Sequence, residues 1–205
     1  MTMKFFYGPK TCALASRIAL EEAGAAYEPV RVDFASGEQT KPAYLAINPK
    51  GRVPALVTDR GVLTENVAIL AFVAQSHPER NLAPLGDPFA FAQMQAFNSY
   101  LSSTVHVNHA HKHRGARWAT EESSFLDMRA KVPETMAASF TLIENDFLAG
   151  PWVMGEAYTV ADAYLFTVAR WLKGDGVDVN RFPKVADHMK RMAERPAVRA
   201  ALAGE

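Results

Sequence analysis

The chain contains a single cysteine, Cys12, in a position that suits a reactive thiol. It follows the loop residues Gly8-Pro9 and precedes a stretch with helical spacing of apolar residues, so it stands where a helix begins. Unpaired N–H groups at a helix start favour an anion and lower the pKa of a thiol from its ordinary ~8.5. A small buried apolar cysteine is the alternative. Tyr7 and Thr11 are rival hydroxyl groups in the same loop, and Ser16 lies one turn into the helix.

A second candidate is the dipeptide Val53-Pro54, where a proline opens an apolar run that reads as a strand. A cis bond before Pro54 would expose the backbone N–H and C=O of Val53 to an extended peptide, which could pair with them as an added strand. An ordinary proline on an edge strand is the alternative.

A third candidate is Glu65-Asn66, at the start of another predicted helix. We expect Asn66 to be the N-cap. The helix start would attract a carboxylate and Glu65 an ammonium, and together these two charges describe an amino-acid head group. Ordinary capping beside a solvated glutamate is the alternative.

The segment from His106 to Arg117 is rich in histidine. On a helix, His109, His113 and Arg117 fall within about 60° of His106, and His111 points elsewhere. Gln95, Ser99 and Ser102 lie on the same side of this helix, and we expect the polar stripe to line a cleft above Cys12. The opposite side should face the core and carries Met94, Phe97, Leu101 and Val105. A solvated face is the alternative for the stripe. No acid or cysteine nearby completes a zinc site, so we predict no metal.

The candidate residues must be positioned by the secondary structure around them. The apolar pattern predicts the element order β-α-β-(α)-β-β-α within the first 77 residues, which is the plan of a thioredoxin-like α/β domain. The expected strands and helices are 4–7, 12–23, 27–33, 41–46, 53–58, 62–64 and 66–75. Pro29 predicts an edge position for its strand, and residues 59–61 a hairpin turn.

Residues 78–87 form a proline-rich linker, and residues 88–205 read as an all-α domain. Its predicted helices span 89–118, 121–148, 160–172 and 185–203. Thr159 and Asp162 have the spacing of a capping box, which predicts a rigid helix start with a role in folding.

The composition excludes several classes of protein. Lys plus Arg and Asp plus Glu are both 22, so no basic excess points to nucleic acid or an anionic membrane surface. A lone cysteine cannot form an intrachain disulfide and suits a reducing compartment. No apolar run approaches a signal-peptide core or the ~20 residues of a membrane span. We therefore expect a cytoplasmic protein.

Four motifs, in this order and spacing, resemble the cytosolic glutathione transferase family over nearly the whole chain. They are those around Cys12, Val53-Pro54, Glu65-Asn66 and Thr159–Asp162. The opening 6–12 is similar to the bacterial beta class with its active-site cysteine, and 48–56 to the segment whose cis-proline presents glutathione's cysteinyl part. Glu65-Asn66 stands where the family has Glu-Ser. The sequence departs from the beta class at four positions: Ala13, Asn66, Ser99 and Val107.

The resemblance implies a homodimeric transferase that uses glutathione as co-substrate, and it assigns the site residues. The implied catalytic residues are Cys12 and His106. Glutathione would contact Tyr7, Thr11, Arg52, Val53, Pro54, Glu65 and Asn66, with Arg52 or Lys41 on its glycine carboxylate. Phe34, His109 and His113 would line the substrate pocket.

We therefore expect conjugation of glutathione to hydrophobic electrophiles in detoxification, or glutathione-dependent thiol-disulfide exchange through Cys12. The alternative from another class is a non-catalytic scaffold of transferase-like fold that binds partner proteins.

Overall fold

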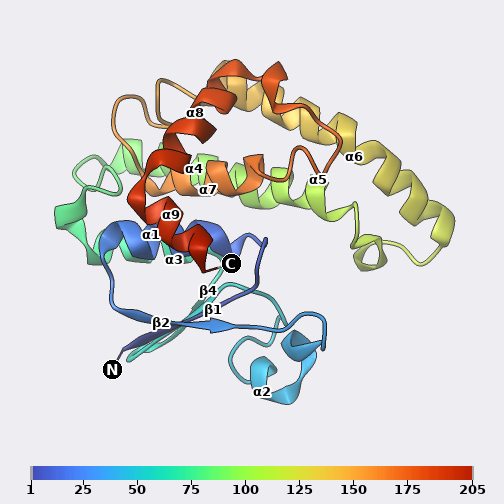
Figure 1. Cartoon of the computed structure of the whole chain (residues 1–205), viewed down its shortest axis with the longest axis horizontal. Helices are drawn as coiled ribbons and strands as arrows, with labels where there is room; N and C mark the ends of the chain where they lie inside the picture. Colours follow the sequence, from blue (N-terminus) through green and yellow to red (C-terminus); the bar gives the residue numbers. More distant parts are fainter. Residues whose placement is uncertain (1, 205) are drawn as a thin grey trace. The chain divides into compact units, whose positions relative to one another are not determined.

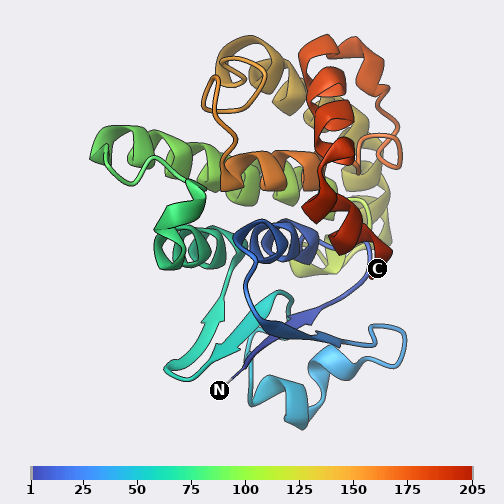
Figure 2. The same ribbon diagram turned by 60° about the vertical axis from the view of Figure 1, so that its left-hand side comes forward.

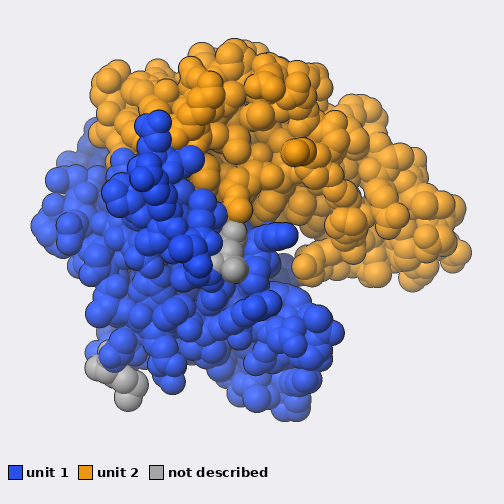
Figure 3. Space-filling view, in the orientation of Figure 1, with its two compact units in different colours: residues 1–91, 193–205 blue, residues 92–192 orange. Residues whose placement is uncertain are grey.

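The computed structural model describes residues 2–204, and these form two compact units: 2–91 with 193–204, and 92–192. Figure 3 colours the two units separately. The last helix thus packs with the first unit, and the chain passes from one unit to the other within two helices, at 91–92 and at 192–193. The boundaries at 77 and 88 stay a prediction.

The first unit has the thioredoxin-like plan that its sequence predicts. Its elements are β1 (Met3–Tyr7), α1 (Ala13–Ala23), β2 (Tyr27–Arg31), α2 (Pro42–Leu45), β3 (Ala55–Thr58), β4 (Gly61–Thr64) and α3 (Asn66–Ser76). The four strands form one mixed sheet in the order β2-β1-β3-β4, with β1 and β2 parallel and the other pairs antiparallel. As predicted, Pro29 lies on an edge strand, where its missing N–H costs no ladder hydrogen bond.

Helices α1 and α3 lie side by side on one face of the sheet, while α2 lies on the other side (Figures 1 and 2). Phe5 of β1 and Leu56 of β3 are fully buried, as are Ile18 of α1 and Ile69 of α3. This apolar layer fixes the starts of α1 and α3 against the ends of the strands, which is where the candidate site residues stand.

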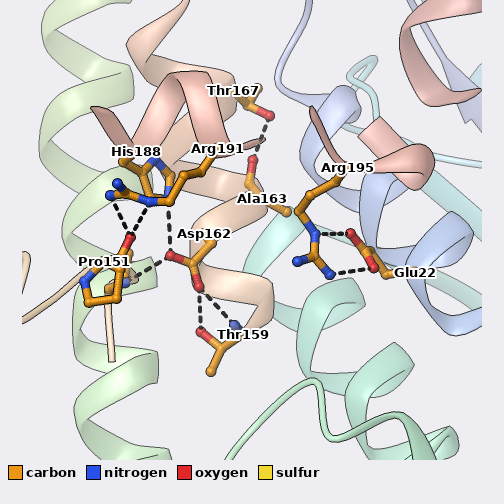
Figure 4. A network of polar contacts seen from close by, with 10 residues as sticks. Glu22, Pro151, Thr159, Asp162, Ala163, Thr167, His188, Arg191 and Arg195 are labelled. Carbon is orange, nitrogen blue, oxygen red and sulfur yellow. Dashed lines mark hydrogen bonds and ion pairs between the residues drawn. The ribbon is translucent and has the colours of Figure 1, made fainter. Parts of the chain in front are cut away.

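The final predicted helix, 185–203, is wrong as a single element. It forms α8 (Pro183–Glu194) and α9 (Pro196–Ala203), with Arg195 in extended backbone between them. The ring of Pro196 disfavours helical backbone at the residue before it, so the helix breaks there. The separate helix α9 packs on α1. Arg195 makes a bidentate ion pair with Glu22, with N···O distances of 2.5 and 2.8 Å (Figure 4).

The regular elements among the described residues of the second unit are helices, and loops and an isolated bridge between Trp152 and Gly155 connect them. Its elements are most of α4 (Pro88–Tyr100), a π-helical segment η3 (Leu101–Val105), α5 (His106–Ala110), α6 (Glu122–Leu142), a second π segment η5 (Ile143–Phe147), α7 (Val160–Ala169) and most of α8. All ten residues of α7 are buried, so this helix is the core of the unit.

The predicted helix 89–118 is also wrong as a single element. The π segment interrupts it after Tyr100, and regular α-helix ends at Ala110, before a turn and a short 3-10 helix, Gly115–Arg117. The buried face is nevertheless the predicted one: Met94, Leu101 and Val105 are fully buried and Phe97 nearly so.

The predicted capping box is present at the start of α7. Asp162 is fully buried and accepts hydrogen bonds from the backbone N–H of Thr159 at 2.7 Å and of Val153 at 2.8 Å (Figure 4). His188 of α8 is also buried, with its Nε2 3.0 Å from the same carboxylate. Asp162 therefore ties the helix start to a loop and to a second helix.

Candidate active site

Cys12 is the N-cap residue of α1, half-buried at the end of the loop after β1. Its Sγ lies 3.5 Å from the carbonyl oxygen of Val53, which the thiol donates to. The sequence prediction that Cys12 stands at a helix start is confirmed. The contact brings the first and second candidate motifs together, although they are 41 residues apart in the chain.

Both hydroxyl groups of this loop are used on backbone carbonyls. Thr11 Oγ1 donates to Gly8 at 2.7 Å and accepts from the N–H of Ala13 at 3.3 Å. Tyr7 donates to the carbonyl of Gly204 at 2.8 Å, and Arg17 donates to the same oxygen at 2.7 Å. The Cys12 thiol, in contrast, points to the segment before Pro54 through its contact with the carbonyl of Val53.

The peptide bond between Val53 and Pro54 is cis, as predicted, and both residues are buried. The preceding carbonyl, that of Arg52, accepts from Tyr44 Oη at 2.7 Å and from Asn48 Nδ2 at 2.6 Å. Burial raises the pKa of Tyr44 to about 12, which keeps the phenol protonated as a donor. Tyr44 and Asn48 therefore hold the backbone of this segment in place, while the Arg52 side chain is exposed.

Glu65 has an unusual backbone and an ionic partner. Its φ of 73° lies in the region that favours glycine, and such strain in a non-glycine residue is typical of functional sites. Lys50 Nζ pairs with the Glu65 carboxylate and donates to Thr64 Oγ1 at 2.8 Å. The carboxylate thus already holds an ammonium, which is the chemistry that the sequence predicts for it.

The prediction that Asn66 caps α3 is wrong, because Glu65 is the N-cap residue and Asn66 is the first residue of the helix. The Asn66 side chain turns inward, where it accepts from Ser16 Oγ at 2.6 Å and donates to the carbonyl of Cys12 at 2.8 Å. Asn66 therefore fixes the turn that carries the thiol.

Phe34 follows β2 and packs on the first loop. A Cβ at Gly8 would lie 2.3 Å from Phe34 Cε2, so a larger residue at Gly8 would force this ring to move. Phe34 thus belongs to the same neighbourhood as Cys12 within the first unit.

The histidines of the predicted stripe belong to the second unit. His106 and His109 both contact Trp171, at ring-centroid distances of 5.0 and 4.3 Å. His113 lies beyond α5 in an exposed turn, and His111 faces Trp118. The stripe therefore holds for His106 and His109 but does not continue as one helical face to Arg117.

Five residues that organise the candidate site and the histidine cluster were not predicted from the sequence. Lys50, Asn48 and Tyr44 lie in the segment before Pro54, and Asp175 and Trp171 lie after α7. The proline and glycine around Lys50 signalled a tight turn, but nothing local signalled that Asp175 would meet His109 from 66 residues away.

Within residues 2–204, no group of three or more His, Cys, Asp and Glu side chains could hold a metal ion. Over the same residues, no helix is long and apolar enough to cross a membrane.

Comparison with known proteins gives matches along both units. The model of the glutathione S-transferase N-terminal domain matches residues 1–75, and that of the C-terminal domain matches residues 119–196. Glutathione S-transferase GstA of Escherichia coli O157:H7 is 36% identical over 99% of this chain and 98% of its own.

Solved structures agree. A glutathione transferase homologue from Sulfitobacter, with bound glutathione, is 52% identical and has a TM-score of 0.96 over 99% of this chain and 98% of its own. A beta-class glutathione S-transferase from Sphingomonas chungbukensis is 31% identical, with a TM-score of 0.85 over 98% of both chains.

Proposed function

The chain belongs to the glutathione S-transferase family and is a glutathione transferase, and we propose that its thioredoxin-like unit binds glutathione with the thiol beside Cys12. Its relatives favour a transferase over the non-catalytic scaffold considered as the alternative. The observation that carries the site assignment is the contact of Cys12 Sγ with the carbonyl of Val53, at 3.5 Å, directly before the cis-proline.

The backbone of Val53 receives the cysteinyl part of glutathione. A peptide that pairs with this backbone as an added strand places its own side chain next to the neighbouring loop. The 3.5 Å contact with Cys12 supports this placement, because it sets the protein's thiol beside the backbone that would hold the ligand's cysteine.

The γ-glutamyl end of glutathione takes the start of α3. Its ammonium pairs with Glu65 in exchange for Lys50, and its carboxylate meets the unpaired N–H groups at the helix start. Asn66 contributes through its backbone, since its side chain is used on Ser16 and Cys12. Arg52 or Lys41, both exposed, binds the glycine carboxylate.

Two reactions fit this arrangement. In conjugation, the glutathione thiolate attacks a hydrophobic electrophile and expels its leaving group. In exchange, the Cys12 thiolate attacks the glutathione sulfur of a mixed disulfide and releases the other thiol. A second glutathione thiolate then attacks the Cys12–glutathione disulfide, which gives oxidised glutathione and restores Cys12. His106 is assigned the accompanying proton transfer, and Phe34, His109 and His113 the acceptor pocket.

The experiment is mass spectrometry after incubation with oxidised glutathione, beside assays of conjugation and exchange. We expect a single glutathione adduct on Cys12, no adduct in Cys12→Ala, loss of exchange in that variant and conjugation that is only reduced. No adduct in the parent chain, with both activities intact in Cys12→Ala, would overturn the assignment of Cys12.

A homodimer in the cytoplasm, with a role in detoxification, completes the proposal. Light scattering on the purified protein should give twice the chain mass, and a monomer would remove the dimer.

A further inference from the structure

The helical unit buries the carboxylate of Asp175 between two donors. The side chain is 0% exposed, and Oδ2 lies 2.7 Å from Nδ1 of His109 while Oδ1 lies 3.5 Å from Nζ of Lys112. Lys112 also donates to the carbonyl of Gly174. A buried carboxylate is tolerated only with such partners, so this cluster has a defined arrangement of donors and acceptors.

That arrangement fixes the tautomer of His109. An ionised carboxylate only accepts hydrogen bonds, so Nδ1 of His109 carries the hydrogen. In a neutral ring Nε2 is then an acceptor, and within residues 2–204 no hydrogen bond to it is present. The side chain is 28% exposed and Nε2 is not among the buried unpaired atoms, so this nitrogen faces solvent.

The ring is also held in orientation. It stacks on Trp171 with 4.3 Å between ring centroids and 20° between planes. The carboxylate at one edge and the indole on one face leave the Nε2 edge for a ligand. The charge of Asp175 is balanced by Lys112. The neutral ring of His109 can therefore accept a hydrogen bond at Nε2 while the ion pair between Asp175 and Lys112 stays intact.

We propose that His109 selects acceptor substrates that carry a weakly acidic hydroxyl group, such as a phenol, and that Asp175 is the positioning residue that makes its Nε2 an acceptor. The proposal rests on the proposed function, which gives His109 a place in the acceptor pocket. It adds the chemical group that this pocket prefers and a residue that the sequence did not reveal.

A matched pair of substrates tests the preference. With 4-hydroxycinnamaldehyde or 4-methoxycinnamaldehyde, the glutathione sulfur bonds to the β-carbon, the π pair moves toward the α-carbon, and that carbon takes a proton from solvent. Nothing is oxidised. His109 would hold the phenol and make no bond in the reaction. One hydrogen bond predicts that the hydroxyl compound is favoured about three- to tenfold in kcat/KM, relative to free-solution reactivity.

Three variants separate the roles. His109→Phe keeps a ring for Trp171 but removes the acceptor, so the preference should vanish. In Asp175→Asn, Lys112 should hold the amide oxygen and turn the amide NH2 toward Nδ1, which makes Nε2 a donor and also removes the preference. Adding Lys112→Met to Asp175→Asn frees the amide to rotate and should restore it. His111→Gln, whose ring faces Trp118, is the control and should leave it unchanged.

Two readouts do not depend on activity. Calorimetry should give tighter binding of 4-hydroxycinnamyl alcohol than of 4-methoxycinnamyl alcohol, with the same dependence on the variants. Nitrogen NMR of histidine-labelled enzyme without ligand should give His109 protonated at Nδ1, and protonated at Nε2 in Asp175→Asn. The pH dependence must be compared across variants, because His106, His113, Lys112 and Arg129 are charged or titratable neighbours of the pair.

An Nε2-protonated His109 in the parent enzyme would overturn the proposal whatever its activity, as would an unchanged alcohol preference in both His109→Phe and Asp175→Asn. Loss of conjugation with both aldehydes, with the alcohol preference intact, would instead count against the proposed function. Melting temperatures identify a variant that fails to fold, and the NMR result on the parent enzyme still decides the tautomer.

Discussion

Glu65 and Lys50 make a direct test of where glutathione's ammonium binds. Replacing Glu65 with Gln removes the charge but keeps the size of the side chain. A charge-assisted hydrogen bond contributes about 1.5–3 kcal/mol, and leaving it unmade weakens glutathione binding. Because the ligand must first displace Lys50, part of this difference is already offset in the parent chain.

The exposure of the pair sets the size of that offset. The Lys50 and Glu65 side chains are 42% and 61% exposed, and exposed pairs contribute only about 0.2–1 kcal/mol. The net loss in Glu65→Gln is therefore roughly 0.5–2.8 kcal/mol, or about two- to a hundredfold in the dissociation constant. By the same reasoning, Lys50→Met should tighten binding by up to about fivefold.

The assay is calorimetry of glutathione binding to the two single variants and the double variant. In the Glu65→Gln background, Lys50→Met should have little effect, because the competition has gone. Lys131→Met breaks a comparably exposed pair with Glu134 and serves as the control. Unchanged affinity in Glu65→Gln would refute the assignment of Glu65. Weaker glutathione binding in Lys50→Met would refute the idea that Lys50 competes with the ligand's ammonium for Glu65. It would indicate that Lys50 itself contacts glutathione.

Three further predictions concern stability and titration. Asp162→Ala leaves buried donors unpaired and should cost about 3–5 kcal/mol in urea unfolding, against little change in the exposed Asp127→Ala. Desolvation, followed by the charges of Lys112 and Arg129, lowers the pKa of His113, so its titration midpoint by NMR should lie below the ordinary ~6.5. Protonation of His113 is then less favourable in the folded chain than in the unfolded chain. The free energy of unfolding should therefore decrease as the pH falls below ~6.5. Burial and then its hydrogen bond to Glu21 raise the pKa of Tyr27 to about 12, so its stabilisation should be present below pH ~10 and decline as pH rises toward 12, less so in Tyr27→Phe.

Local patterns were sufficient for most of the first unit. Alternation, the glycine after Ala23, the turn at 59–61 and the proline at an edge each act over a few residues, and each predicted element is present. The Thr159–Asp162 box was readable for the same reason. Pro196 was equally visible as a break, yet the apolar period that runs through it suggested one helix.

The site was less predictable where side chains act over long separations. Asn66 has the type of an N-cap, but a buried donor and acceptor 50 and 54 residues away took its side chain inward, and Glu65 became the cap. Cys12 could be placed at a helix start from sequence, whereas its contact with Val53 depends on how the sheet brings two loops together. Lys50 had no local pattern that linked it to Glu65.

The histidine stripe illustrates a different limit. A helical wheel assumes about 100° per residue throughout, and the π segment Leu101–Val105 breaks that assumption by widening one turn. The stripe also required a regular helix as far as Arg117, but α5 ends at Ala110, so His113 and Arg117 do not continue the face of His106 and His109. His106 and His109 lie after the segment and keep their mutual spacing, which is why both reach Trp171. π turns are frequent at functional sites. The π segment directly before His106 therefore supports a role for His106 and His109 in the chemistry of the helical unit.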